Sequence, residues 1–351
     1  MRIGLFTNAH SAQAGGGVLE MSGWAHVITG VGKVDLLFAS EVSARDLSQV
    51  CGVDLSGVTV GRAQRGGWMG IEQIMTDRAY DVVVRQSIRV PKPTFCRRAI
   101  LLTDFPMQKE VSWRERQYLK SYSVVVGISK FTAEWIARRW GRSAVVICPP
   151  ILQVPSLTKM PWIVAAGRFT SGKRSKHQLE MILHFRRLLD GGGLTGWELH
   201  LCGGADDPAY LTEVRQAAYG LPVRIHAGVP RQELDEVLGH ASIFWHATGI
   251  AYSEQENPEL MEHFGMSAAE AMAAGCVPVV VGRGGLKEVA GPDLLGWTWQ
   301  SWDECVQKTK TLIENPELRA SLSEKARWQA EGFGFARFQN QVRGLVRGLT
   351  R

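Results

Sequence analysis

Two acidic residues eight positions apart, Glu262 and Glu270, carry the clearest chemical signal in this sequence. A tight turn at Phe264-Gly265 separates them, and a run of small residues follows. If that run is helical, its N-terminus presents free N–H groups and a partial positive charge, which suit a phosphate. A carboxylate accepts from two vicinal hydroxyl groups, so acids that flank such a site suit hydroxyls. The stretch therefore predicts a site for a ligand that carries both.

The same stretch predicts the elements that position the two acids. Ser267 followed three residues later by Glu270 is typical of a capping box, and we expect a helix over residues 268–274 that stops at Gly275. The apolar run 276–281 then predicts a buried parallel strand. In the alternative interpretation Glu270 only caps its helix and the other acid is a solvated loop residue.

A second candidate site follows the apolar segment 162–167, where Arg168 and Lys173 lie five positions apart across a short Thr-Ser-Gly turn. Two cations on one loop after a strand can converge on a diphosphate, the arginine as a fork and the lysine as a point charge. The alternative is a solvated basic loop.

The N-terminus gives a weaker signal of the same kind. An apolar segment at 3–7, a glycine-rich loop with Gly16 and Gly17, and a helix-like segment at 18–28 form an arrangement that can approach a phosphate. The glycines do not spell GxGxxG, so the dinucleotide fingerprint is absent. His10, in the same loop, can approach a ligand, although a lone loop histidine is more often solvated.

Polar residues at the ends of two apolar runs are further candidates. Asp104 follows the run 99–103 and His246 ends the run 243–246. In open α/β sheets the carboxyl ends of strands line the ligand cleft. The bland interpretation of His246 is a strand-end residue with a structural role.

The whole chain alternates short apolar runs with helical or loop segments, which predicts an α/β fold with parallel sheets and crossover helices. Pro149-Pro150 and the breaker-rich segment 153–161 indicate an interdomain linker. We expect an N-terminal domain at 1–152, a C-terminal domain at 162–333, and a last helix at 334–351. An edge strand is expected at 294–299. The remaining runs are at 34–39, 58–60, 82–85, 124–128, 144–148, 198–202 and 223–226.

The segment EHFGMSAAEAMAAGCVPVV, with GGLKEV after it, resembles the signature of glycosyltransferase family 4, in its mannosyltransferase-like branch. The string SKFTAEWIARRWG resembles the end of the N-terminal domain in that branch. The resemblance covers most of the chain and is densest from 162 to 289. It implies a GT-B fold, in which two Rossmann-like domains face a central cleft and the C-terminal helix crosses back to the first domain. The first domain would bind the acceptor and the second the nucleotide-sugar.

The resemblance also implies a reaction and roles for residues. In retaining transfer a hexose moves from a nucleotide-diphosphate sugar to an acceptor hydroxyl, and no carboxylate nucleophile is required, unlike in a retaining hydrolase. The protein supplies positioning and charge neutralisation. The implied roles are a diphosphate clamp (Arg168, Lys173), sugar hydroxyl binding (Glu262), ribose binding (Glu270), approach to phosphate and sugar (Gly16, Gly17, Phe264, Gly265, Met266), the base (Val229, Arg231) and the donor (His246).

One departure concerns Asp104, because the branch usually has a histidine of a His-Phe/Tyr-Pro motif there. This leaves open the donor sugar and the local chemistry, in which we expect Asp104 to take part. The sequence has no DxD motif, so we expect no catalytic metal and no cofactor. The donor, a UDP- or GDP-sugar, is a substrate.

Charge distribution bears on the acceptor. The chain has 40 Lys and Arg against 34 Asp and Glu, a net charge of +6. Residues 85–142 hold thirteen basic and four acidic residues, a local excess of +9. These are solvated helix faces or a surface for an anionic partner. We favour a membrane surface and a lipid-linked or cell-envelope glycan. Nucleic acid, with a modified DNA base as acceptor, is the alternative.

Composition and termini predict where the protein acts. The first residues lack a signal-peptide core, no run of about eighteen apolar residues exists, and the six cysteines are scattered. We expect a cytoplasmic protein that can attach peripherally to the inner membrane face. Its oligomeric state is left open, and so are two other functions, a GT-B-fold sugar-nucleotide epimerase and a non-catalytic sugar-nucleotide binder.

Overall fold

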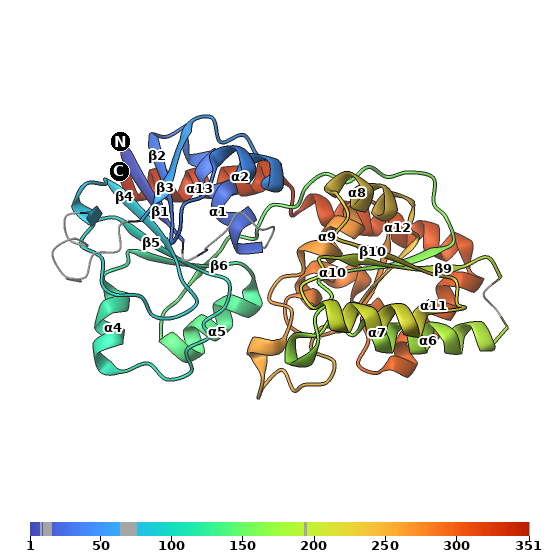
Figure 1. Ribbon diagram of the computed structural model, residues 1–351. Helices are drawn as coiled ribbons and strands as arrows, with labels where there is room; N and C mark the ends of the chain where they lie inside the picture. The colour runs from blue at the N-terminus through green and yellow to red at the C-terminus, as the bar shows by residue number, and fades with distance from the viewer. Residues whose placement is uncertain (8, 10–15, 64–75, 193–194, 351) are drawn as a thin grey trace. The chain divides into compact units, whose positions relative to one another are not determined.

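A computed structural model describes the chain apart from residues 8, 10–15, 64–75, 193–194 and 351. The chain divides into two compact units, each with its own parallel sheet (Figure 1). The first contains residues 1–150 and 335–351, and the second contains residues 151–334. The expected α/β architecture of two Rossmann-like units is confirmed, and the terminal helix belongs to the first unit.

The first unit is built on a seven-stranded sheet with the order β3-β2-β1-β4-β5-β6-β7, in which all neighbours are parallel. Its strands coincide with apolar runs because a parallel strand is covered on both faces. The last run forms only a two-residue strand. The strands are β1 (Arg2–Phe6), β2 (Lys33–Phe38), β3 (Val58–Arg62), β4 (Val82–Gln86), β5 (Ala99–Thr103), β6 (Val124–Gly127) and β7 (Val145–Val146).

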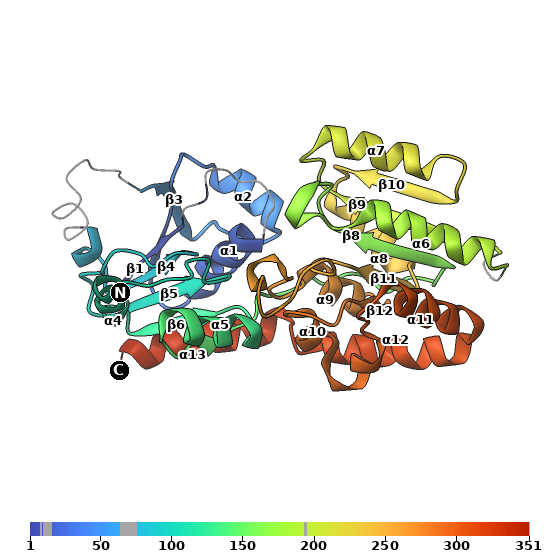
Figure 2. The ribbon, with the colours of Figure 1, turned by 90° about the horizontal axis from the view of Figure 1, so that it is seen from below.

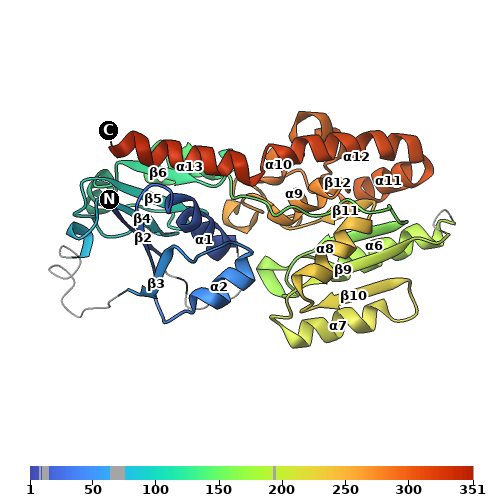
Figure 3. The same ribbon diagram turned by 90° about the horizontal axis from the view of Figure 1, so that it is seen from above.

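Helices cover both faces of this sheet, and neighbouring residues of one strand serve different faces. Val84 packs in the core with α1 and α13, whereas Val83 packs in the core with α4 and α5. The terminal helix α13 packs against α1 (Figure 3). Between these helices, Phe338 meets Trp24 edge to face with ring centroids 6.3 Å apart. The helices are α1 (Gly16–Ile28), α2 (Ala44–Cys51), α4 (Trp113–Lys120), α5 (Lys130–Trp140) and α13 (Phe335–Thr350).

Local caps define where these helices begin and end. The Ser129 side chain accepts from the Thr132 N–H at 3.0 Å, and Gly141 ends α5 in the left-handed region, with φ 66°. A capping box between Ser112 and Glu115 starts α4. An oxygen at the N-cap satisfies a backbone N–H that has no partner in the helix.

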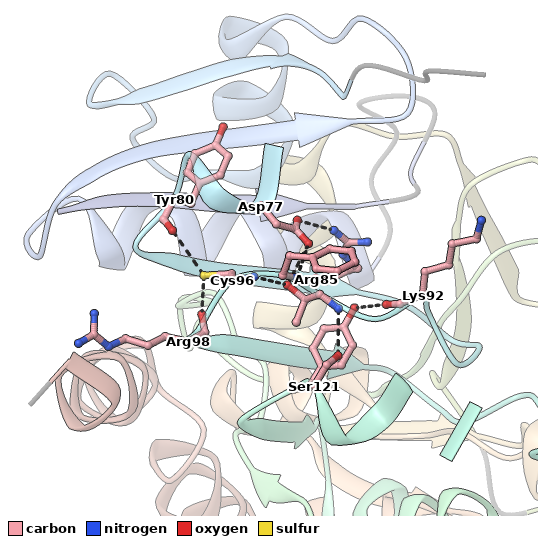
Figure 4. Close-up of polar contacts among 10 residues, drawn as sticks. Asp77, Tyr80, Arg85, Lys92, Cys96, Arg98 and Ser121 are labelled. Carbon is pink, nitrogen blue, oxygen red and sulfur yellow. Dashed lines mark hydrogen bonds and ion pairs between the residues drawn. The ribbon is translucent and has the colours of Figure 1, made fainter. Parts of the chain in front are cut away.

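A buried carboxylate fixes the long connection between β4 and β5, which contains no helix (Figure 4). Asp77 is fully buried and accepts from Arg85 Nη2 at 3.1 Å, from Thr94 Oγ1 at 3.0 Å and from the Phe95 N–H at 3.0 Å. An ionised buried carboxylate needs such donors to offset its lost hydration. The connection at 87–98 is therefore held in place by side chains.

The second unit has a five-stranded parallel sheet with the order β10-β9-β8-β11-β12. In Figure 1, α6 and α7 lie on one side of this sheet, and α8 and α9 lie on the other. The strands are β8 (Trp162–Ala166), β9 (Glu198–Gly203), β10 (Val223–Ala227), β11 (Ile243–His246) and β12 (Val277–Val280). The helices are α6 (Gln178–Asp190), α7 (Pro208–Ala218), α8 (Arg231–His240), α9 (Met266–Ala273), α10 (Leu286–Leu294), α11 (Trp302–Glu314) and α12 (Pro316–Glu331).

The expected edge strand at 294–299 is wrong. The segment forms a 3-10 helix, Leu295–Trp297, and pairs with the sheet only through a bridge between Val281 and Trp299. The Trp299 side chain is fully buried and its Nε1 donates to the Val279 carbonyl at 3.0 Å. The segment is therefore apolar because it contains the buried Trp299 indole and the turn before it, and not because it forms a strand.

No described helix has both the length and the apolar character needed to span a membrane. Figure 2 shows that the helices of both units lie against the sheets.

Candidate functional site

The central site of the second unit forms where two neighbouring strands end. Strands β8 and β11 are parallel partners, so the segments that follow them emerge at the same edge of the sheet. Lys176 follows β8, and its Nζ donates to Glu262 Oε2 at 2.7 Å. His246, the last residue of β11, places its Nε2 at 3.3 Å from the same oxygen. We call Lys176, His246 and Glu262 the carboxylate site.

The hydrogen bonds of His246 define its tautomer. The Thr248 N–H lies 3.4 Å from Nδ1 and can only donate, so Nδ1 carries the lone pair. Nε2 therefore carries the proton and donates to Glu262. The side chain is buried, and burial lowers the pKa of His246 although Glu262 opposes this effect. A neutral ring that donates to a carboxylate fits both observations.

Glu262 is held in the ionised state. Burial alone would raise its pKa, but the Lys176 ammonium and the His246 ring outweigh burial and hold the pKa well below its usual range. The side chains of Glu262 and Lys176 are each 23% exposed, so the pair is not sealed from a ligand. Both contacts use Oε2, and within the described residues no hydrogen bond involves Oε1. That oxygen can accept from a ligand hydroxyl.

A small recess adjoins the carboxylate site. Its lining includes Gly167, Lys176, Gln178, His246 and Thr248. The Thr248 hydroxyl is buried and, among the described residues, has no hydrogen-bond partner. A buried hydroxyl without a partner is costly, so a polar ligand group would stabilise it.

Glycines after β12 fix the position of the carboxylate site. A Cβ on Gly284 would lie 2.4 Å from the Glu262 carbonyl oxygen, and one on Gly285 would lie 2.4 Å from the His263 carbonyl oxygen. The Gly285 N–H donates to the Glu262 carbonyl at 2.8 Å. The two backbones approach so closely that only glycine fits at both positions.

The predicted capping box at Ser267 and Glu270 is wrong. The chain enters α9 through Gly265, whose φ is 110°, and no side chain caps the helix. The helix begins at Met266, so Ser267 lies inside the first turn and cannot occupy the N-cap. The stop at Gly275 is confirmed, with φ 90° and its N–H donating to the Met272 carbonyl at 2.9 Å.

Glu270 is held by an arginine instead. Arg231, the first residue of α8, places Nη1 at 3.1 Å from both carboxylate oxygens, and its Nε donates to Asp235 at 2.7 Å. The Glu270 side chain is 7% exposed. Burial raises the pKa of Glu270, and Arg231 opposes that rise. The cation therefore offsets part of the cost of burying this carboxylate. Half-buried Val229 lies two residues before Arg231, in the loop after β10.

The cations of the predicted diphosphate clamp lie on the surface. The Arg168 side chain is 61% exposed and its Nη1 donates to Asp206 at 3.2 Å. Lys173 is exposed in the 3-10 turn Gly172–Arg174. Neither contacts the carboxylate site, and the sequence reasoning passed over Lys176, three residues further on. The serine-lysine-histidine segment at 175–177, just before α6, was the sequence feature that could have indicated this lysine.

The turn between the two acids contains buried Phe264 and Gly265 and half-buried Met266. The Phe264 ring is buried against Phe333, with ring centroids 5.3 Å apart at 80°. A Cβ on Gly265 would lie 2.8 Å from a methyl group of Leu286. The turn is therefore packed on its inner side, and α9 begins directly at its end.

The first unit brings other candidates together at the carboxyl ends of β1, β4 and β5. A Cβ on Gly17 would lie 2.8 Å from Gln86 Nε2 and 3.2 Å from Asp104 Oδ2. Gln86 Nε2 donates to the Gly17 carbonyl at 3.2 Å and to Asp104 Oδ1 at 3.4 Å, while Gln86 Oε1 accepts from Thr7 at 2.8 Å. Gly16 is exposed at the start of α1. His10 lies outside the described residues.

Two units that each hold a parallel sheet between layers of helices have the architecture of the GT-B fold. The sequence model of the family "Glycosyl transferases group 1" matches residues 153–329, about half of the chain, and the chain belongs to this family. The match includes the carboxylate site and the Arg231–Glu270 pair.

Solved structures share this fold. WaaG, a glycosyltransferase involved in lipopolysaccharide biosynthesis, is 12% identical with a TM-score of 0.62 and covers 97% of this chain and 99% of its own. An O-GlcNAc transferase mutant of Thermobaculum terrenum is 12% identical with a TM-score of 0.61, covering 99% and 67%. TarM is 13% identical with a TM-score of 0.57, covering 75% and 54%. At these identities the likeness shows the fold alone.

A curated relative adds a similarity in sequence. The chain is 23% identical over 262 residues to a GDP-Man:Man(3)GlcNAc(2)-PP-Dol alpha-1,2-mannosyltransferase of Dictyostelium discoideum. The match covers 66% of this chain and 50% of that protein, so the chain spans about half of the relative's length.

Proposed function

We propose that the protein is a retaining glycosyltransferase of family 4 that moves a hexose from a nucleotide-diphosphate sugar to a hydroxyl of a lipid-linked or cell-envelope glycan. The observation that carries this proposal is the carboxylate site, in which ionised Glu262 contacts a lysine and a neutral histidine where β8 and β11 end. The site lies inside the segment that matches the family.

In the proposed reaction, Glu262 Oε1 accepts a hydrogen bond from a hydroxyl of the donor sugar. Lys176, with its ammonium 2.7 Å from Glu262, is the cation that we propose meets the departing diphosphate beside the sugar, while Arg168 and Lys173 would meet it from the exposed loop. The acceptor hydroxyl attacks from the face that the diphosphate leaves, and a phosphate oxygen takes its proton. Positioning and charge neutralisation lower the barrier, with no catalytic metal.

The proposed donor is a GDP-sugar, with a UDP-sugar as the next choice. The relative in Dictyostelium discoideum is named for GDP-mannose and a dolichol-linked acceptor, which supports this order. The Glu270 carboxylate would bind the ribose, and Arg231 and Val229 would lie near the base. Since Arg231 holds Glu270 without a ligand, ribose binding has to share or replace that contact.

The proposed acceptor lies at an anionic membrane surface, on its cytoplasmic face. Helix α4 carries Trp113, which is 73% exposed, together with Arg114, Arg116 and Lys120. An exposed indole beside basic side chains suits the lipid interface, where the ring enters the headgroup region and the cations attract anionic lipids. The same charges also fit nucleic acid, whose binding would weaken steeply with salt.

A thermal-shift panel of GDP-, UDP-, ADP- and dTDP-sugars tests the donor. A ligand at 100 times its Kd stabilises the native state by about 2.7 kcal/mol, which corresponds to roughly 5–10 °C for a unit of this size. We expect such a shift with one nucleotide class, and its loss in Lys176→Met and Arg168→Ala. Lys310→Met, which removes an exposed lysine on α11, is the matched control.

Turnover separates the remaining functions. Transfer to a membrane extract, with retention at the anomeric carbon, supports the proposal. Conversion of the donor to an isomer without an acceptor would identify an epimerase, and binding without turnover would identify a sugar-nucleotide sensor. If none of the sugar-nucleotides shifts the melting temperature, the proposal fails.

A further inference from the structure

Two carboxyl groups meet in the first unit, apart from the carboxylate site. Glu20, on α1, is 1% exposed, and its carboxyl group hydrogen-bonds that of Asp104, just after β5. Among the described residues, Glu20 Oε1 has no hydrogen-bond partner. Two ionised carboxylates offer only acceptors, so a hydrogen bond between them requires a proton.

The surroundings supply neutral groups. From β1 and β4, Thr7 and Gln86 form a chain in which Thr7 Oγ1 donates to Gln86 Oε1 at 2.8 Å and Gln86 Nε2 donates to Asp104 Oδ1 at 3.4 Å. From α5, Thr132 Oγ1 donates to the Asp104 carbonyl at 2.9 Å. The Gln86 amide is thereby fixed in one orientation, with its donors toward Asp104.

No described cation compensates the pair. Within the described residues, Asp104 is the only charged group that acts on Glu20, and the hydrogen bonds of Glu20 and Gln86 are the only side-chain effects on Asp104. Arg85, the neighbour of Gln86 on β4, is directed instead to Asp77, at 3.1 Å. Two adjacent carboxyl groups in a buried place cannot both ionise, and this is why paired aspartates come to share a proton.

We infer that Glu20 and Asp104 share one proton at neutral pH, and that Glu20 is the positioning residue that keeps Asp104 as a singly charged acceptor for a substrate hydroxyl. Burial, and then Asp104, raise the pKa of Glu20 well above its usual range. Burial also raises the pKa of Asp104, against the hydrogen bonds from Glu20 and Gln86. The proton therefore resides mainly on Glu20 and is donated to Asp104.

The consequence for transfer rests on the proposed function. Asp104 stands where the resemblance predicts a histidine, and Gly17 leaves room beside it, since a Cβ there would lie 3.2 Å from Asp104 Oδ2. With Glu20 protonated, the pair carries one negative charge and can accept from a sugar hydroxyl. When the pH rises and Glu20 loses its proton, the pair carries two adjacent negative charges, and Glu20 no longer donates the hydrogen bond that holds Asp104 as an acceptor.

The proton itself can be observed without any substrate. Infrared spectroscopy of the full chain at pH 7 should show a carbonyl band of a protonated carboxylic acid that disappears as the pH rises. Glu20→Gln should remove the band, and Asp104→Asn should shift its frequency because the acceptor of the proton changes. Glu110→Gln, at an exposed acid, should leave it unchanged. Absence of the band in the wild type, or its survival in Glu20→Gln, would overturn the inference.

The positioning role is tested by the pH dependence of kcat/KM once a donor is identified. Glutamine donates an N–H to Asp104 without titrating, so Glu20→Gln should abolish the alkaline fall of the wild-type profile, whereas Glu20→Ala should lower activity at least tenfold at all pH values. An equal fall in both profiles would refute the role. If no sugar-nucleotide binds, the proposed function fails, and the infrared result still decides whether the proton is shared.

Discussion

Replacing Lys176 with methionine removes the cation that holds Glu262 ionised. The two side chains are joined by a 2.7 Å contact and are each 23% exposed. The pair is therefore intermediate in exposure between a surface ion pair and a buried one. Exposed pairs contribute at most about 1 kcal/mol, whereas loss of one partner of a buried pair costs about 3–5 kcal/mol. We expect Lys176→Met to destabilise the second unit by about 2 kcal/mol, or roughly 4–8 °C in melting temperature.

The pH dependence of this loss follows from the direction of the pKa shift. Glu262 titrates lower in the folded protein than in the unfolded chain, so it contributes stability above its unfolded pKa. That contribution is lost as the pH falls through the folded pKa. Without Lys176 the folded pKa rises, so the variant should lose stability at a higher pH than the wild type. Urea unfolding of both proteins between pH 7 and pH 3 measures this.

The same variant decides which lysine meets the diphosphate. We expect Lys176→Met to weaken donor binding by about 10–100-fold, as for loss of a partly desolvated charge contact. Lys173→Met, on the exposed turn, should have a smaller effect. The structural reasoning is refuted if Lys173→Met abolishes donor binding while Lys176→Met has the same stability and the same donor affinity as the wild type. The diphosphate clamp is then the Arg168–Lys173 pair predicted from the sequence.

Three further predictions concern stability. Asp77→Ala leaves Arg85 without its buried partner and should lower the stability of the first unit by about 3–5 kcal/mol, measured by calorimetry; Asp77→Asn, which keeps an acceptor, should cost less. Gly285→Ala forces a Cβ against a backbone carbonyl and should lower both the melting temperature and donor affinity; no loss would mean that the turn can move. Arg231→Met leaves Glu270 buried without its cation, so stability should fall as the pH rises from 5 to 8 in urea unfolding, and a flat difference from the wild type would contradict this.

The sequence was sufficient for the sheets because a parallel strand buried on both faces reads as a continuous apolar run. Each run from 3–7 to 144–148 forms a strand of the first sheet, and Ser129 and Gly141 bound α5 where their types predict. The prediction of an edge strand at 294–299 was wrong because the apolar Trp299 side chain packs into the core without being part of a strand. Periodicity shows that a residue is buried but does not show which element buries it.

The site was less predictable, since its contacts join distant parts of the chain. Lys176 meets Glu262 across 86 positions and Arg231 meets Glu270 across 39. The spacing of Ser267 and Glu270 matched a local cap, but the left-handed Gly265 started the helix two residues early and freed Glu270 for a partner from α8. Local patterns identified both acids, whereas their partners depend on which strand ends the fold brings together.

Those partners bear on how a ligand would bind. Each glutamate of the motif forms an ion pair with a cation, Glu262 with Lys176 and Glu270 with Arg231. A buried carboxylate without such a partner would take up a proton and lose its ability to accept from two hydroxyls. The cations therefore keep both acids ready as acceptors, and a sugar-nucleotide would add its hydroxyls and diphosphate to charges that are already paired. Under the proposed function, we therefore expect ligand binding at this site to exchange partners, with a strength that depends on the cations as much as on the acids.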